Sequence, residues 1–275
     1  MKKFKIPTWY YQQFDADFSL DVPAEGYGGW KKEILPINPE KTAVVIMHAW
    51  DCGTYEQFPG WYRAVEYIPR ANKIASEIFP DLLSEIRKSG MKLLHVASDS
   101  GYGFGYPGYK KTLELCEKFD TEDPLTKLTA PCPDDISMDL RKFKKANSFV
   151  GAHNQPDVDK GRAFKKFMKE AEPAGDEPVV INCEQLHAVC LEYGINHLIY
   201  IGFAINWCLQ YSPGNMNDMF RRGFLCSTIR EAVTAVENKE SARNESNKEY
   251  GLWVTALQNG FVYDLEDFIS LLKNL

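Results

Sequence analysis

The sequence predicts an α/β fold in which helices cover both faces of a mainly parallel sheet. Short apolar segments alternate with longer helical patterns from Thr42 to the C-terminus, which is the order expected of βαβ units. The first apolar segment, residues 42–47, is almost entirely apolar or β-branched, as in a strand buried on both faces. The chain of 275 residues, 44% of them hydrophobic, is long enough to bury such a sheet in one domain.

The elements follow in order along the chain. Residues 1–40 are rich in proline, glycine and aromatic side chains. We interpret them as an extended arm packed on a single domain, residues 41–275, with an insertion near 150–178. Glycine ends two of the predicted helices, at Gly90 and Gly194. The predicted strands are 42–48, 91–99, 177–182, 196–204 and 224–229, and the predicted helices are 68–90, 111–119, 159–171, 184–194, 206–223, 245–260 and 264–274.

Composition and charge exclude several classes of function. The net charge of −6 is spread along the chain, so neither a nucleic acid nor a membrane is expected as a partner. The N-terminus lacks the apolar core of a secretory signal, and no apolar run has the length that crosses a bilayer. The seven cysteines are scattered without metal-binding spacing, which indicates reduced thiols in a cytoplasmic protein.

Polar and reactive side chains follow three of the predicted strands, at 48–51, 99–101 and 204–208. Parallel sheets of this kind bind ligands beyond the carboxyl ends of their strands. The first of these ends carries His48, Trp50, Asp51 and Cys52 in quick succession. We therefore expect a ligand site where these three strand ends meet.

The last of these ends places a cysteine at the start of a predicted helix. Asn206 suits the N-cap position, which puts Cys208 in the first turn. The free amides and the helix dipole there stabilise a thiolate, and the same amides can receive the oxyanion of acyl transfer. The alternative is that Cys208 is a small apolar residue packed under the helix.

The stretch Gly202-Phe203-Ala204-Ile205-Asn206-Trp207-Cys208 resembles the nucleophile turn of the isochorismatase-like cysteine hydrolases, roughly G-x-x-T-x-x-C, with Ile205 in place of the usual threonine. The helix and strand before it and the strand after it, which leads into Glu231-Ala232, are also similar to that family. The resemblance implies a three-layer α/β/α fold and hydrolysis of an amide-type C–N bond through an acyl-enzyme on Cys208. It further implies a dimer or tetramer, and a non-prolyl cis peptide, expected at Ala204–Ile205.

The first strand departs from the family pattern. Where the family has a catalytic aspartate, this chain has His48, and the nearest carboxylate is Asp51. A histidine can take the proton of a cysteine directly, and Asp51 could orient its ring. The alternative is that His48 is structural and the centre is inactive. The chain would then be a relative that binds a small molecule or a partner protein through the same pocket.

The family's lysine opens a K-x-x-x-S-A-F-like run, which residues 140–151, LRKFKKANSFVG, resemble with Asn147-Ser148-Phe149 in place of Ser-Ala-Phe. One extra residue leaves the register open, so Lys142 and Lys144 both qualify. The alternative is that this stretch is a plain basic surface run. Members that hold a metal use histidines soon after the second strand, and here Asp99 is followed by none. We therefore expect no metal and no cofactor.

The substrate is expected to be a small molecule with an apolar or planar group. Transfer of the acyl group to an acceptor other than water stays open. The residues predicted to contact the substrate are Trp50, Asp51, Asp99, Phe149, Ala204 and Trp207.

Overall fold

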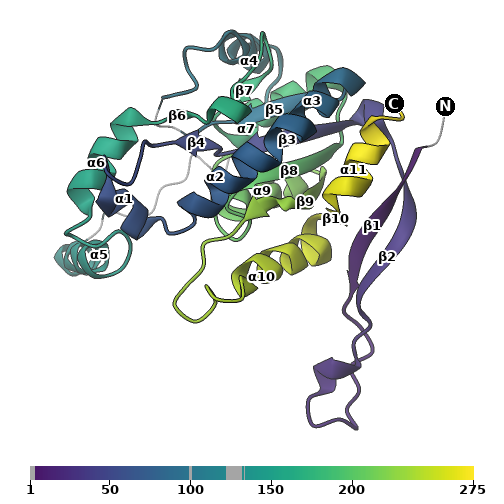
Figure 1. Cartoon of the computed structure of the whole chain (residues 1–275), viewed down its shortest axis with the longest axis horizontal. Helices are drawn as coiled ribbons and strands as arrows, with labels where there is room; N and C mark the ends of the chain where they lie inside the picture. Colours follow the sequence, from purple (N-terminus) through teal and green to yellow (C-terminus); the bar gives the residue numbers. More distant parts are fainter. Residues whose placement is uncertain (1–3, 99–100, 122–131, 133) are drawn as a thin grey trace.

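The computed structural model describes residues 4–98, 101–121, 132 and 134–275, and it is built around one eight-stranded sheet (Figure 1). The strand order is β2-β1-β10-β9-β8-β3-β5-β7. The six strands from β10 to β7 run parallel, and β1 and β2 are antiparallel at one edge. Helices lie on both faces of this sheet, so the predicted α/β fold class is confirmed.

The strands of the main sheet are short except at the hairpin and at β9. They are β1 (Phe4–Gln12), β2 (Gly29–Ile37), β3 (Thr42–Met47), β5 (Lys92–Val96), β7 (Val179–Val180), β8 (His197–Phe203), β9 (Leu225–Thr234) and β10 (Val262–Tyr263). A separate two-stranded sheet is formed by β4 (Trp50–Asp51) and β6 (Lys166–Phe167).

The α-helices are α1 (Pro59–Ala64), α2 (Ile68–Glu77), α3 (Phe79–Ser89), α4 (Pro107–Lys118), α5 (Asp135–Asn147), α6 (Gln155–Phe164), α7 (Cys183–Tyr193), α8 (Cys208–Tyr211), α9 (Met216–Arg221), α10 (Ser246–Val254) and α11 (Leu265–Leu272). Single turns of 3-10 helix occur at Pro23–Gly26, Pro39–Lys41 and Lys169–Ala171, and a π-helical turn, Thr255–Asn259, follows α10.

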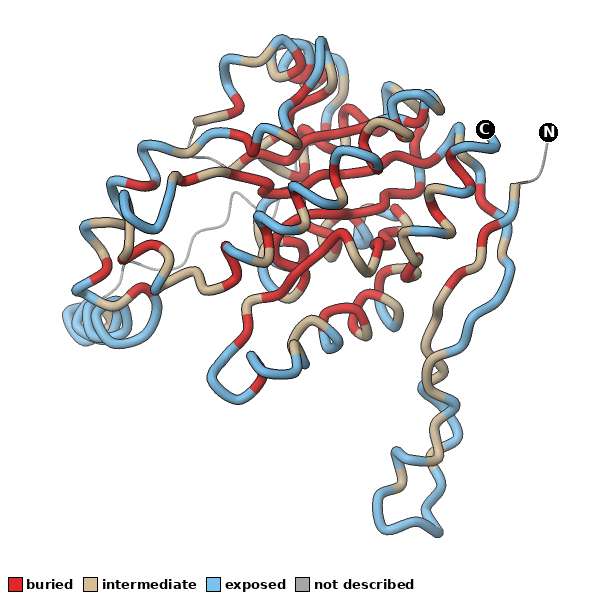
Figure 2. Tube along the Cα trace, viewed as in Figure 1, coloured by how far each residue is buried: buried red, intermediate tan, exposed pale blue. Residues whose placement is uncertain are grey.

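Buried residues lie on both faces of the sheet, and every residue of the central strand β3 is buried (Figure 2). Val44 and Ile46 belong to a cluster with the buried side chains of α2, α3 and α11. Val45 and Met47 belong to a second cluster with those of α7, α9 and α10. Alternate residues of one strand therefore pack against opposite helical layers, which explains the near-continuous apolar sequence of β3.

The arm at residues 4–37 is an antiparallel hairpin, a form that its proline- and glycine-rich sequence did not indicate. All nine residues of β1 pair with β2, and Trp9 pairs with Val262 of β10, so the hairpin extends the sheet. Its tip projects away from the body of the protein (Figure 1) and carries exposed apolar side chains, Phe18 among them at 87% exposure. The division into an arm and one domain stays a prediction.

Three predicted elements have different limits in the structure. The helix expected at 68–90 is two helices, because Pro80 lies in the first turn of α3 and cannot donate to the preceding turn. The helix expected at 206–223 is divided into α8 and α9 on either side of Pro213 and Gly214. The helix expected at 159–171 is α6, which ends at Phe164 and is followed by β6.

Candidate active site

A cavity of about 290 Å³ lies at the carboxyl ends of β3 and β8 and contains both His48 and Cys208 in its wall. The two strands are hydrogen-bonded neighbours, so residues that follow them necessarily meet at one edge of the sheet. The described residues in its wall are His48, Trp50, Trp61, Ala64, Val65, Tyr67, Ser98, Phe149, Val158, Arg162, Lys165, Ile181, Trp207, Cys208, Ser212, Pro213 and Val236.

The turn that carries the cysteine is stabilised by two hydrogen bonds to one backbone carbonyl. The amides of Trp207 and Leu209 both donate to the carbonyl oxygen of Ala204, each at 3.1 Å. The amide of Ile205 donates to Thr234 on β9, at 2.8 Å. No acceptor among the described residues is recorded for the amide of Cys208 itself. The cis peptide is Phe203–Ala204, one residue before the predicted position.

Asn206 does not cap the helix as predicted. Its side chain bonds the backbone of Val236 twice, since Nδ2 donates to the carbonyl oxygen and Oδ1 accepts from the amide, both at 2.9 Å. Trp207 occupies the cap position without a side-chain bond, and α8 spans only Cys208–Tyr211. Cys208 is thus at the start of a short helix, which has a weaker dipole than the long helix predicted.

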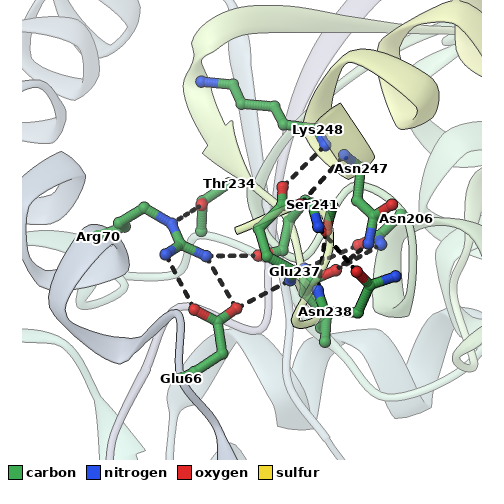
Figure 3. A network of polar contacts seen from close by, with 11 residues as sticks. Glu66, Arg70, Asn206, Thr234, Glu237, Asn238, Ser241, Asn247 and Lys248 are labelled. Carbon is green, nitrogen blue, oxygen red and sulfur yellow. Dashed lines mark hydrogen bonds and ion pairs between the residues drawn. The ribbon is translucent and has the colours of Figure 1, made fainter. Parts of the chain in front are cut away.

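The segment that Asn206 holds is itself anchored by a polar network (Figure 3). The buried carboxylate of Glu237 accepts from the amides of Asn247 and Lys248, at 3.1 and 3.0 Å. The amide of Glu237 donates a hydrogen bond to the carboxylate of Glu66. This carboxylate also accepts hydrogen bonds from both terminal nitrogens of Arg70. These bonds fix the end of β9 against α2, and through Val236 they fix one wall of the cavity.

His48 is buried at the end of β3 with a positive φ of 54°. Burial, and then the positive charge of Lys165, lowers the pKa of its imidazole to about 3. The ring is therefore neutral at physiological pH. The structure records no hydrogen bond from this ring to Cys208 or to any other described group.

Both carboxylate oxygens of Asp51 have partners other than His48. Its Oδ1 accepts from the amide of Gly53 at 2.8 Å, and its Oδ2 pairs with Lys166 at 3.5 Å. It does not line the cavity that contains Cys208. The structure thus does not place Asp51 to orient the imidazole, as the Cys–His–Asp arrangement would need.

The lysine at the cavity is Lys165, which follows α6. Its Nζ lies 4.7 Å from the ring centroid of Trp50 and 5.4 Å from that of Trp61. Lys142 and Lys144 are exposed on α5, and neither lines the cavity. Sequence reasoning missed Lys165 because residues 164–169 have the pattern of a solvated basic helix face.

The aromatic residues predicted to contact substrate do line the cavity. Trp50, Phe149 and Trp207 form part of its wall, and Phe149 meets Trp207 edge to face at 5.3 Å. Ala204 lies behind the turn instead of in the wall, and Asp99 lies outside the described residues. Trp61 and Tyr67, which the sequence did not indicate, complete the aromatic wall.

The described parts of the chain contain neither a cluster suited to a metal ion nor a helix suited to a membrane. No three His, Cys, Asp or Glu side chains there are grouped so that they could hold a metal ion. No described helix combines the length and apolar character needed to cross a membrane. All seven cysteines are free thiols.

Among known proteins, this chain is similar to several solved structures. No family model and no curated protein matches the sequence. A cysteine hydrolase from Pseudomonas syringae pv. phaseolicola 1448A is similar over 87% of this chain and 96% of its own, with 14% identity and a TM-score of 0.48. An isochorismatase-like hydrolase from Alkaliphilus metalliredigens is similar over 85% of this chain and 98% of its own, with 14% identity and a TM-score of 0.46.

A third similar structure is the N-carbamoylsarcosine amidase from Thermoplasma acidophilum. It covers 82% of this chain and 97% of its own, with 15% identity and a TM-score of 0.42. These proteins are of the class that the Gly202–Cys208 motif resembles. The chemistry of this chain has to follow from its own side chains.

Proposed function

We propose that this protein is a divergent isochorismatase-like cysteine hydrolase that cleaves an amide-type C–N bond of a small molecule through an acyl-enzyme on Cys208. The observation that carries the proposal is the meeting of Cys208 and His48 in the wall of one cavity, from two adjacent strand ends. The cysteine is half-buried, and aromatic side chains form much of the wall beside it.

In this mechanism the Cys208 sulfur attacks the amide carbon while His48 accepts the thiol proton. The carbonyl oxygen becomes an oxyanion that receives a hydrogen bond from the amide of Cys208. When the C–N bond breaks, the imidazolium of His48 returns the proton to the leaving nitrogen, which departs as an amine. Water then attacks the thioester while His48 takes its proton, and the carboxylic acid and the free thiol are released.

Protonation of His48 is costly in this setting. Relative to an ordinary histidine pKa of 6.5, a pKa of about 3 corresponds to about 5 kcal/mol against the imidazolium. The same shift makes the imidazolium a strong acid, which favours protonation of the leaving nitrogen. Burial is the main cause of this low pKa, and the positive charge of Lys165 adds to it.

The weak basicity of His48 also favours a second candidate function. If the proton transfer does not occur, the protein is a catalytically inactive relative that binds a small molecule in the same cavity. A third possibility keeps the acyl-enzyme and passes the acyl group to an acceptor other than water. The three are separated by whether an acyl group forms on Cys208, and by whether water removes it.

An activated ester tests the proposal without knowledge of the natural substrate. With p-nitrophenyl acetate we expect an acetyl group on the peptide that contains Cys208, detected by mass spectrometry, which disappears within minutes as water releases acetate. Cys132 is exposed and serves as the internal control for unspecific acylation. No adduct on Cys208, or acylation of Cys132 alone, contradicts the proposal, and an adduct that water does not remove favours transfer to another acceptor.

The acylation rate should not fall between pH 7 and pH 5. A base whose pKa has been lowered to about 3 stays in its accepting, neutral form throughout this range, whereas an ordinary histidine would lose its base form below about pH 6.5. His48→Gln should slow acylation about 100-fold at every pH in that range. A rate that falls tenfold per unit below pH 6.5, or an unchanged rate in His48→Gln, contradicts the role of His48.

We also propose that the protein is a cytoplasmic homo-oligomer, a dimer or tetramer. The free state of all seven cysteines is consistent with a reducing compartment. The apolar side chains of the projecting hairpin tip, Phe14, Phe18, Leu20 and Val22, are exposed in the single chain and suit a contact between copies. Sedimentation equilibrium determines the state directly, and a monomer at micromolar concentration would contradict it.

A further inference from the structure

The charged side chains of the cavity wall are of one sign. Among the described residues that line it, the permanently charged ones are Arg162 and Lys165, and none is an aspartate or glutamate. Both cations come from the end of α6 and the turn that follows it. The rest of the wall is mainly aromatic or aliphatic. The cavity therefore combines an apolar surface with a cationic side.

Two carboxylates on segments that contribute to this wall are engaged elsewhere. Asp157, on the same helix, accepts from the amide of Gly60 at 2.8 Å and so fastens α6 to α1. Glu66 receives Arg70 in the network behind the cavity. The positive side of the cavity is thus not balanced by these neighbouring carboxylates.

Arg162 is the cation that reaches solvent at the cavity mouth. It is exposed in the last turn of α6, and the structure records neither a hydrogen bond nor an ion pair between its guanidinium and any described residue. A guanidinium presents two parallel N–H groups, a geometry that matches a carboxylate. Lys165 lies further in, over the rings of Trp50 and Trp61, where it adds positive charge beside the apolar wall.

We propose that the substrate is an amide that joins an apolar or aromatic group to a carboxylate, and that Arg162 determines this specificity by pairing with the carboxylate. The aromatic wall holds the apolar group, and the amide bond lies between the two, near Cys208. That the substrate is an amide rests on the proposed function. The preference for an anionic ligand rests on the cavity alone.

Binding of a matched pair of ligands tests the charge preference without turnover. The probes are hippurate, which is N-benzoylglycine, and its neutral methyl ester, titrated by calorimetry into the Cys208→Ala variant. We expect hippurate to bind at least about tenfold tighter than the ester at low salt, because a hydrogen-bonded ion pair in a partly dry site contributes that much. The preference should shrink as salt is added.

The decisive variants are Arg162→Gln and Lys160→Gln. Both remove one positive charge from an exposed position of α6, but Lys160 does not line the cavity. We expect Arg162→Gln to abolish the preference by weakening hippurate binding about tenfold while leaving the ester unchanged. Lys160→Gln should behave like the parent protein.

Three results would overturn the inference. They are equal binding of hippurate and its ester, a preference that survives in Arg162→Gln, and no binding of hippurate at millimolar concentration. Because the nucleophile is absent from these experiments, absence of an acyl-enzyme in the parent protein would sink the proposed hydrolase and leave the anion preference standing. An acyl-enzyme without a charge preference would do the reverse.

Discussion

Cys208→Ala should lower the hydrolysis of p-nitrophenyl acetate at least about 1,000-fold, because no other group in the cavity wall can form the thioester. The variant should keep its fold. The thiol is half-buried at the start of a short helix, so its loss should change the free energy of unfolding by less than about 1 kcal/mol. Release of p-nitrophenolate measures the first effect, and urea denaturation measures the second.

Cys132→Ala is the matched control, since it removes an exposed thiol that does not line the cavity. It should retain full activity. If Cys208→Ala keeps more than about a tenth of the parent rate, the nucleophile has been misassigned. If the parent protein itself has no activity above that of Cys208→Ala, the inactive binding relative becomes the better account.

Gly202→Ala should destabilise the protein by more than about 3 kcal/mol, which is large against the total stability of a domain. Gly202 has a φ of 112°, and a Cβ built on it would lie 2.1 Å from the carbonyl oxygen of Met47. Met47 belongs to the buried strand β3, which pairs with β8 at this point and cannot move away without breaking the sheet. Urea denaturation, or failure to recover folded protein, measures the effect.

Gly223→Ala separates the two causes of that cost. Gly223 also has a positive φ, of 94°, but a Cβ at this position would meet no atom within 4 Å. It should lose only about 1 kcal/mol, the cost of the backbone conformation. If the two variants are equally stable, the close approach of β3 and β8 is not the constraint. If they differ as expected, the glycine of the Gly202–Cys208 motif has a structural reason independent of chemistry.

The fold could be predicted where the local sequence determines the structure. β3 and β8 are buried runs that admit few other interpretations, and the helix ends at Gly90 and Gly194 follow from their left-handed conformation. The hairpin β1–β2 could not be predicted, because its proline, glycine and aromatic residues show no clear period, although its two strands pair with each other over nine residues. Only its place in the sheet, with Trp9 opposite Val262, depends on distant sequence. Its local pattern resembles a loop.

The site shows the same division. His48 and Cys208 could be brought together from sequence because both follow parallel strands, and such strand ends share one edge of the sheet. The partner of Asp51 and the position of Lys165 depend on β4 pairing with β6, two strands of two residues each with no sequence signal of their own. Lys165, whose charge acts on the imidazole of His48, was therefore missed, because its basic run resembles an ordinary surface helix.

The hairpin also constrains the order in which the protein can be completed during synthesis. β1 and β2 are translated well before β10, which is the neighbour of β1 on its other side, and before Asp264, which Trp9 and Lys32 of the hairpin bond. Until those residues are translated, the aromatic-rich strand pair has no neighbour in the sheet. Non-local pairing of this kind forms more slowly than pairing with adjacent sequence and leaves the strand edge exposed in the meantime.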